Sequence, residues 1–274
     1  MDNALTFDVE DWFEGLDPDP ANWERYEPRV EKSTRVIMKL LERHETRATF
    51  FFLGYIAERF PDLVKKVQDA GHEVAAHGYY HRFIYRQTPD EFRDEVIRTK
   101  EILQNITRQP VTGFRAPYFS IVKSTLWALD VLAELGFSYD SSIFPIFNHR
   151  YGIPRARRDP HKPALKTGQS LVEFPISTIR LLGRNWPFSG GIYFRFLRPG
   201  FIARGIRSLN KKGWPAVMYL HPWEFDPHQP VHPRIPFTLR FRHYYKLEKT
   251  EAKLDRLLQE FTFKPMVELV GDVS

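Results

Sequence analysis

Cysteine is absent from the 274 residues of the chain. Its absence excludes disulfide bonds, a thiolate nucleophile and thiolate metal ligands, so any bound metal would depend on imidazoles and carboxylates. It does not identify the compartment, because an exported protein need not contain disulfides.

Long apolar runs are also missing. No run approaches the about 20 apolar residues of a membrane-spanning helix, and no basic segment followed by an apolar one precedes the first apolar run. We therefore expect neither a membrane span nor a cleaved export signal, and we expect a cytoplasmic location.

A strong excess of one charge is lacking as well. The formal net charge is +6, from 40 Lys and Arg against 34 Asp and Glu, and the basic residues are spread along most of the chain. We therefore expect no nucleic acid partner, although the basic tract at residues 234–246 would suit one. Hydrophobic residues make up 42% of the chain and aromatic residues 15%, as in an ordered globular protein.

Apolar runs alternate with helical patterns along the chain. Runs of strand length occur at residues 4–7, 48–53, 74–76, 111–114, 171–174, 216–220 and 266–270. Helical spacing occurs at residues 31–44, 62–70, 89–106, 124–135, 201–209 and 247–261. The alternation predicts an α/β fold with a parallel sheet, either open or closed into a barrel.

Helix caps and loops complete this prediction. Ser33 is a candidate cap for the first helix, and Thr88 and Glu91 form a capping box for the helix that begins at Pro89. Proline-rich or polar stretches predict loops at residues 17–28, near 147–170 and at 227–245.

Polar residues follow four of the apolar runs directly. They are Asp8 to Asp11, His77 to His81, Arg115 to Tyr118, and His221. Because the carboxyl ends of parallel strands meet at one edge or mouth, we expect these side chains to line one pocket. Two imidazoles four residues apart, joined by a carboxylate from elsewhere, can hold a divalent metal and leave one position open. Taken alone, the two histidines could equally lie in a surface loop.

Six motifs together resemble those of the carbohydrate esterase family 4 polysaccharide deacetylases, which have the NodB-homology fold. They are TFDVED from Thr6, ATFFFLG from Ala48, HGYYH from His77, RAPY from Arg115, YDSS from Tyr139 and LHPWE from Leu220. The resemblance covers nearly the whole chain, and the HPWEFDP run is most similar to deacetylases that accompany exosortase-linked exopolysaccharide gene clusters.

This resemblance implies a single domain over residues 1–274, folded as a distorted (β/α)7 barrel, with an insertion near 147–170 and a C-terminal extension from about 225. It implies metal-dependent hydrolysis of N-acetyl groups from the amino sugars of a polysaccharide. Zinc is the favoured metal, with Co²⁺, Ni²⁺ or Fe²⁺ as alternatives.

The resemblance also implies roles for individual residues. His77 and His81 would be metal ligands, and Asp8 would be the general base. Arg115 would orient Asp8, and the backbone N–H of Tyr118 would help to bind the oxyanion. The remaining two roles concern the proton donor: His221 would be the general acid, and Asp140 would orient and charge it.

The acidic motif departs from the family pattern of two adjacent aspartates, base and then ligand. Here Val9 separates Asp8 from Glu10 and Asp11. Strand alternation favours Glu10 as the third ligand, whereas a bulge favours Asp11. We choose Asp11, because a short carboxylate suits a tight site, and keep Glu10 as the alternative.

Several aromatic residues lie near these motifs. Trp12, Tyr118 and Trp223 are candidate substrate-binding residues, and Phe119, Trp186 and Tyr193 are further candidates for walls that stack on sugars. Core packing explains each of them equally well. The pair Gly190 and Gly191 could let the backbone approach a substrate, or could form a simple turn.

Two other functions remain open at this point. An amidohydrolase acting on small cyclic or linear amides would use the same chemistry. A barrel that only binds carbohydrate would result if the altered acidic motif had removed activity. The expected partner in the first hypothesis is an acetylated polysaccharide or oligosaccharide; the oligomeric state is left open.

Overall fold

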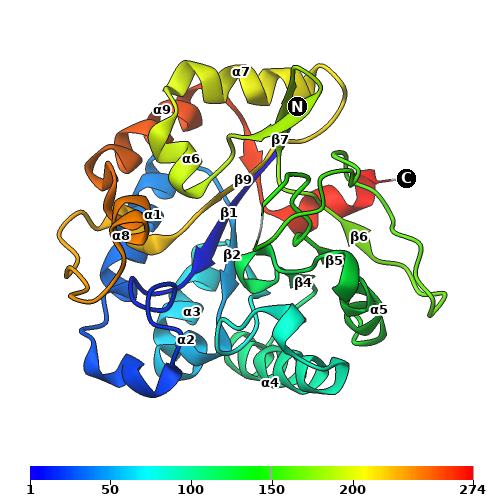
Figure 1. Ribbon diagram of the computed structural model, residues 1–274, viewed down its shortest axis with the longest axis horizontal. Helices are drawn as coiled ribbons and strands as arrows, with labels where there is room; N and C mark the ends of the chain where they lie inside the picture. Colours follow the sequence, from blue (N-terminus) through cyan, green and yellow to red (C-terminus); the bar gives the residue numbers. More distant parts are fainter. Residues whose placement is uncertain (149, 274) are drawn as a thin grey trace.

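The computed structural model describes residues 1–148 and 150–273. Its centre is a parallel sheet surrounded by helices (Figure 1). In the described part of the chain the sheet has eight strands: β1 (Asn3–Val9), β2 (Thr49–Phe52), β3 (Glu73–Ala76), β4 (Gly113–Phe114), β5 (Tyr139–Asp140), β6 (Val172–Glu173), β9 (Val217–Leu220) and β10 (Phe263–Lys264).

Strand β1 is the hub of the sheet. Residues 4–7 pair with β9, residues 6–9 pair with β2, and residues 3–4 pair with β10. From β2 the order runs through β3, β4 and β5 to β6, and every pair is parallel. All residues of β1 are buried, as expected of a strand covered on both faces.

The sheet curls into a half-barrel. Between β6 and β9 the backbone carbonyl of Ser177 accepts a hydrogen bond from Ser189 Oγ, at 2.9 Å. The backbone of Ser189 in turn accepts from Tyr219 N in β9, at 3.0 Å. The inner face carries side chains such as Phe51 and Phe174, which belong to one apolar cluster. The structure confirms the predicted α/β class and the distorted (β/α)7-type barrel.

Helices cover the outside of this half-barrel (Figure 1). In the described residues they are α1 (Val30–Arg43), α2 (Gly54–Arg59), α3 (Pro61–Asp69), α4 (Pro89–Thr107), α5 (Trp127–Glu134), α6 (Gly191–Phe196), α7 (Pro199–Asn210), α8 (Phe237–Tyr244) and α9 (Thr250–Glu260). Their apolar faces pack on outward side chains of the strands, such as Phe50 and Phe52. None of the helices in the described residues combines the length and hydropathy of a membrane-spanning segment.

Helix starts agree with the sequence in one case and differ in another. Thr88 and Glu91 form both hydrogen bonds of a capping box at α4. Ser33, in contrast, does not cap α1: it lies inside the helix, where its Oγ donates to the backbone carbonyl of Arg29 at 2.7 Å. The first N–H groups of α1 are satisfied by Asp11 instead, as described below.

The chain after residue 175 departs from the sequence prediction in several places, among them the helix α6, which was not predicted. The 227–245 tract contains α8 as well as loop, because its prolines end at Pro236 and the next eight residues can form a helix. The last strand is β10, and residues 266–272 form a 3-10 helix that begins after Pro265. The hairpin of β7 (Thr178–Leu181) and β8 (Arg184–Pro187) was not predicted. The 147–170 segment is loop in its described residues; residue 149 lies outside them.

Gly190 explains how α6 approaches the sheet. Its backbone is extended, so any residue could adopt its φ of −179°. A Cβ at this position, however, would lie 2.0 Å from the backbone oxygen of Tyr219 in β9. Close packing against β9, rather than flexibility near a substrate, therefore requires glycine here.

We expect Gly190→Ala to lower the free energy of unfolding by about 1–3 kcal/mol, because the backbone of β9 must shift. Gly200→Ala in α7 is the matched control: a Cβ there meets no atom within 4 Å. The control should be neutral, or more stable by up to about 1 kcal/mol, through helix propensity. Urea denaturation of both variants measures the difference, and equal effects would contradict the packing argument.

Candidate metal centre and active site

The C-terminal end of β1 delivers two carboxylates to one pocket. Asp8 and Glu10 are both almost completely buried, at 2% and 4% exposure, and both line a pocket of about 160 Å³ at the carboxyl ends of the strands. Residues two apart on a strand face the same side. Asp8 lies in β1 and Glu10 is the first residue after it, so alternation continued one residue beyond the strand places both side chains in the site.

Glu10 lies against the two imidazoles that follow β3. Its Oε1 is 3.3 Å from Nε2 of His81 and 3.8 Å from Nε2 of His77. The chain turns between the two histidines at Gly78, which has a φ of +74°, and His81 itself has a φ of 53°. These left-handed positions bring both rings to the same carboxylate.

Asp11 does not join this cluster, so our choice of Asp11 over Glu10 was wrong in placement. Its Oδ2 accepts hydrogen bonds from the backbone N–H groups of Arg29 and Val30, at 2.7 and 3.0 Å. Its Oδ1 accepts from Trp12 N at 2.8 Å. Asp11 thus satisfies the free N–H groups at the start of α1, and burial raises its pKa to about 6.

Arg115 contacts Asp8, the residue that it is expected to orient. Its Nη1 donates to Asp8 Oδ1 at 2.6 Å, and the guanidinium is completely buried. Nε donates to the backbone carbonyl of Ser141, at 3.1 Å, and Nη2 to the hydroxyl of Ser141, at 3.0 Å. The guanidinium group of Arg115 also lies over the ring of Phe51, with its Cζ 4.2 Å from the ring centroid. The guanidinium is therefore fixed from several sides, and its charge compensates the buried carboxylate.

His221 follows β9 and faces both carboxylates of β1. Its Nε2 is 3.5 Å from Glu10 Oε1 and 4.0 Å from Asp8 Oδ2. Its other nitrogen, Nδ1, is 3.3 Å from Oε2 of Glu224, three residues along the chain. Glu224 also accepts from the backbone N–H of His221, at 3.1 Å, so it fixes both the ring and the backbone of this residue.

Arg195 forms a second buried ion pair of the site, with Glu224. From α6, its Nε donates to Glu224 Oε1 at 2.8 Å, and both side chains are buried. Nη1 donates to the carbonyls of His243 and Tyr245, and Nη2 to that of Arg242. Arg195 thereby ties the acidic partner of His221 to the end of α8.

The predicted pairing of Asp140 with His221 is therefore wrong. Asp140 accepts from the hydroxyl and the backbone N–H of Ser142, at 2.6 and 3.1 Å. Ser142 Oγ in turn accepts from the backbone N–H of Ala116, at 2.7 Å. Asp140 supports the loop that carries Arg115. It also pairs with Glu173 across β5 and β6, and burial together with the charge of Asp140 raises the pKa of Glu173 well above its usual value.

Charge interactions determine the protonation states of His221 and Glu10, which face each other in the pocket. Burial alone would lower the pKa of His221, but the carboxylates of Glu10, Glu224 and Asp8 outweigh it and raise the pKa to about 9. Burial would raise the pKa of Glu10, but His81, His221 and His77 bring it well below its usual value. His221 is therefore protonated and Glu10 ionised near neutral pH.

Some of the aromatic residues that we expected to bind substrate line the pocket, and others lie in the apolar core or elsewhere. Trp223 lines the pocket and stacks between His221 and His243, with ring centroids 5.1 and 4.1 Å away. Tyr118, with a φ of 56°, also lines the pocket and packs against His81, with the two rings tilted by 44° and their centroids 4.1 Å apart. Trp12 is 2% exposed and packs in an apolar cluster, so its prediction as a substrate-binding residue is not supported.

Phe119 and Tyr193 also line the pocket that contains Asp8 and His221, and Gly191 forms part of its wall. Trp186 lies outside it, in a neighbouring groove of about 1290 Å³. The groove and the pocket share Tyr193 as a lining residue.

Glu10, His77 and His81 fit a divalent metal. One ligand atom from each lies within 4.8 Å of the others, and all three residues are buried. His77 donates from Nδ1 to the carbonyl of Arg115 at 2.8 Å, which leaves the lone pair of Nε2 free, and Nε2 has no hydrogen-bond partner among the described residues. A hydrogen bond donated by the ring nitrogen that does not bind the metal orients a metal-binding imidazole in this way.

Sequence reasoning missed Glu224 and Arg195. Glu224 lies within the HPWE motif, at the i+3 spacing at which a glutamate can reach back to a backbone N–H, so the spacing could have indicated it. Arg195 is 26 residues before His221 in the sequence, and no pattern points to it. The hydrogen bonds with the end of α8 that orient it form only in the folded chain.

Known proteins and protein families resemble this chain in separate parts and over its whole length. A model of a domain of unknown function, DUF3473, matches residues 141–271. A peptidoglycan-N-acetylglucosamine deacetylase from Bacillus cereus is 36% identical over 104 residues, which cover 38% of this chain and 38% of that protein. The match thus spans well under half of that relative's length.

Solved structures share the fold. A candidate polysaccharide deacetylase from Mycobacterium smegmatis superposes with a TM-score of 0.66 at 21% identity, covering 98% of this chain and 88% of that one. An allantoinase superposes with a TM-score of 0.60 at 16% identity, over 98% and 88% of the two chains. Finally, the family model described as polysaccharide deacetylase matches residues 3–139, half of the chain, and the protein therefore belongs to the polysaccharide deacetylase family.

Proposed function

We propose that the protein is a metal-dependent hydrolase that removes N-acetyl groups from amino-sugar residues of a polysaccharide. One observation carries the proposal: a set of side chains able to bind a metal lies beside a buried carboxylate, Asp8, and an imidazole, His221. Glu10 belongs to that set, its Oε1 is 3.5 Å from Nε2 of His221, and Asp8, Glu10 and His221 each offer a ligand atom within 4.8 Å of the others. The family membership and the names of the relatives support it.

Glu10, His77 and His81 would hold the metal in this proposal. When bound, a divalent cation supplies Lewis-acid polarisation of a carbonyl and makes water more acidic. Two imidazoles and one carboxylate suit zinc, which we propose as the native metal, with Co²⁺, Ni²⁺ or Fe²⁺ as alternatives. Glu10 replaces the adjacent aspartate of the family pattern, because alternation along β1 points its longer side chain into the site.

Asp8 would accept the proton of the attacking water. Arg115 occupies its Oδ1, so Oδ2 is the oxygen that remains for this role. The ion pair fixes the carboxylate in position, and a positioned general base contributes typically about 10²–10⁴-fold to a rate. The backbone N–H of Tyr118 would donate to the developing oxyanion, in the left-handed turn beside His81.

His221 would donate a proton from Nε2 to the amine as the C–N bond breaks. An amine leaves readily only when protonated, so the donor must be charged before the step. Glu224 accepts from Nδ1, which orients the ring and favours its charged form, and Arg195 fixes Glu224. These two residues are positioning residues, because they act through His221.

The finer assignments stay predictions. They are the cytoplasmic location, the single-domain organisation over residues 1–274 and an association with exopolysaccharide synthesis. An acetylated polysaccharide or oligosaccharide is the proposed substrate class.

Acetate release tests the function directly. We expect the metal-loaded protein to release acetate from N-acetylchitohexaose, measured by an enzyme-coupled acetate assay, and not to hydrolyse allantoin. The allantoinase shares the fold, so allantoin turnover without acetate release would favour the small-amide hypothesis. Binding of acetylated glycans without any acetate release would favour a barrel that only binds carbohydrate.

Metal content distinguishes Glu10 from Asp11. We expect Glu10→Gln, His77→Ala and His81→Ala each to weaken metal affinity by more than about tenfold, since the loss of a direct metal ligand should matter at least as much as the loss of its hydrogen-bonding partner. Asp11→Asn should retain the metal, because its carboxylate faces the start of α1. Elemental analysis after dialysis measures this; a metal-free Asp11→Asn protein beside a metal-loaded Glu10→Gln protein would reverse the assignment.

The pH dependence tests the partner of His221. His221 acts in its protonated form, so activity should fall as pH rises through its pKa, which the nearby carboxylates raise to about 9. Glu224→Gln removes one of these negative charges, which lowers the pKa and moves the alkaline limb of kcat/KM to lower pH. Asp140→Asn is the control and should leave the alkaline limb at the same pH. A shift of the limb in this control alone would indicate that Asp140, and not Glu224, is the partner of His221.

A further inference from the structure

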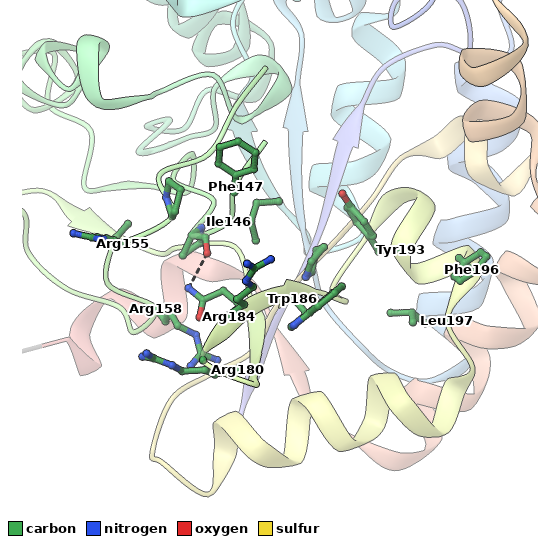
Figure 2. Close-up of a pocket in the computed structure, with 16 residues that line it drawn as sticks. Ile146, Phe147, Arg155, Arg158, Arg180, Arg184, Trp186, Tyr193, Phe196 and Leu197 are labelled. Carbon is green, nitrogen blue, oxygen red and sulfur yellow. Dashed lines mark hydrogen bonds between the residues drawn. The ribbon is translucent and has the colours of Figure 1, made fainter. Parts of the chain in front are cut away.

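A large groove lies beside the active-site pocket, with a volume of about 1290 Å³. Three elements line it: the loop before and after residue 149, the β7–β8 hairpin, and α6 (Figure 2). Asn185 of β8 donates to the backbone carbonyl of Pro145 at 2.8 Å, which links the hairpin to the loop. The groove is thus a built feature of the fold.

Four arginines give this groove a single sign of charge. Arg155, Arg158, Arg180 and Arg184 line it, and its described lining residues include no carboxylate (Figure 2). Within residues 1–148 and 150–273, no Asp or Glu oxygen lies within 4.0 Å of any of the four guanidinium groups. Burial, and then the charge of Arg180, lowers the pKa of Arg158, and the charge of Asp159 only partly opposes this shift.

Aromatic rings lie among these charges. Trp186 is 49% exposed, and Phe147 and Phe196 are also exposed, although they border a concave surface. Figure 2 shows Trp186 between Arg184 and Tyr193. Large exposed aromatic side chains in a groove are typical of binding sites, and flat rings suit the faces of sugar rings.

Further arginines line the neighbouring active-site pocket, together with the carboxylates of Asp8 and Glu10. Tyr193 lines both the groove and the pocket that contains Asp8 and His221. Arg150 and Arg242 line that pocket, and neither has a carboxylate within 4.0 Å in the described part of the chain. A ligand that entered the site could therefore extend across Tyr193 into the groove.

We propose that the groove binds carboxylate-bearing sugars that flank the acetylated residue, so that the substrate is an anionic polysaccharide. The inference rests on the proposed deacetylase function and adds the charge of the substrate to it. Guanidinium groups pair with carboxylates through two parallel hydrogen bonds, and the aromatic rings would stack on the intervening sugars.

An anionic lipid surface is the alternative occupant. Leu181 and Leu182 at the tip of the hairpin are 50% and 91% exposed, and the basic residues Arg180 and Arg184 flank them. The leucines do not line the groove, however, whereas the arginines do so beside Trp186 and within reach of the active-site pocket. A concave, aromatic and basic surface that continues into a catalytic pocket favours a glycan chain.

Binding of matched glycans tests the proposal. The probe is a hyaluronan octasaccharide, which alternates glucuronate with N-acetylglucosamine, and the neutral reference is the same octasaccharide after reduction of its carboxyl groups. Dissociation constants are measured by calorimetry on metal-loaded protein in the His221→Ala background, which blocks turnover. We expect the charged probe to bind about tenfold more tightly than the reduced one, and salt to reduce this preference.

Substitution of the groove arginines tests whether they cause the preference for the charged octasaccharide over the reduced one. The combined variant Arg155→Gln, Arg180→Gln and Arg184→Gln should bring the ratio of the two affinities close to one, since each exposed ion pair contributes modestly and three together give about tenfold. The matched control replaces three exposed arginines on the surfaces of α1, α7 and α9, Arg35→Gln, Arg204→Gln and Arg256→Gln. It removes the same net charge and should keep the ratio.

Two results would overturn the inference. The first is equal affinity of the wild-type groove for the charged and reduced octasaccharides; acetate release from N-acetylchitohexaose would then still support the deacetylase proposal. The second is a loss of affinity in the control variant as large as in the groove variant, which would indicate a general effect of net charge. Binding to phosphatidylglycerol vesicles that Leu181→Ser and Leu182→Ser abolish, together with equal glycan affinities, would assign the hairpin to a lipid surface instead.

Discussion

Two buried carboxylates at the end of β1 are the constraint on which the site depends. Asp8 and Glu10 are nearly inaccessible to solvent, and a buried charge is costly unless a partner compensates it. Arg115 compensates Asp8, and the imidazoles of His77, His81 and His221 surround Glu10. These partners follow β3, β4 and β9, which belong to the same sheet as β1. The fold therefore brings to the two carboxylates the groups that compensate their charge.

A second ion pair extends this balance outward. Glu224 and Arg195 are both buried, and they link His221 to the backbone carbonyls at the end of α8. The proline-rich tract that sequence patterns predict as loop therefore helps to fix the charge and orientation of the proposed acid. A helix placed there gives three carbonyl oxygens to one guanidinium, which a mobile loop would not hold in position.

Sequence patterns were sufficient for the central strands of the sheet, for the edge of the sheet at which the site lies and for most of the residues that face one another there. The reason is physical. Period, apolar runs and caps are local signals, and the polar residues after them follow directly, as for His77, Arg115 and His221. The errors concern contacts between distant segments. Nothing near Asp11 shows that the N–H groups of α1 will meet it, and nothing near Asp140 shows that His221, which is distant in the sequence, will pair with Glu224 and not with Asp140. Trp12 likewise differs from a pocket residue only through its neighbours in space.

The division of the site between the two matched halves limits what family membership alone implies. The half that matches the polysaccharide deacetylase model contains Asp8, Glu10, His77, His81 and Arg115. His221, Glu224 and Arg195 all lie in the half that matches a domain of unknown function, as do the four groove arginines. Both halves contribute strands to one sheet, because β9 and β10 pair with β1. In our proposal, a proton acceptor and a metal site in one half would form a complete hydrolase only with the proton donor from the other, so the second half would supply the acid step and the contacts that select the polymer.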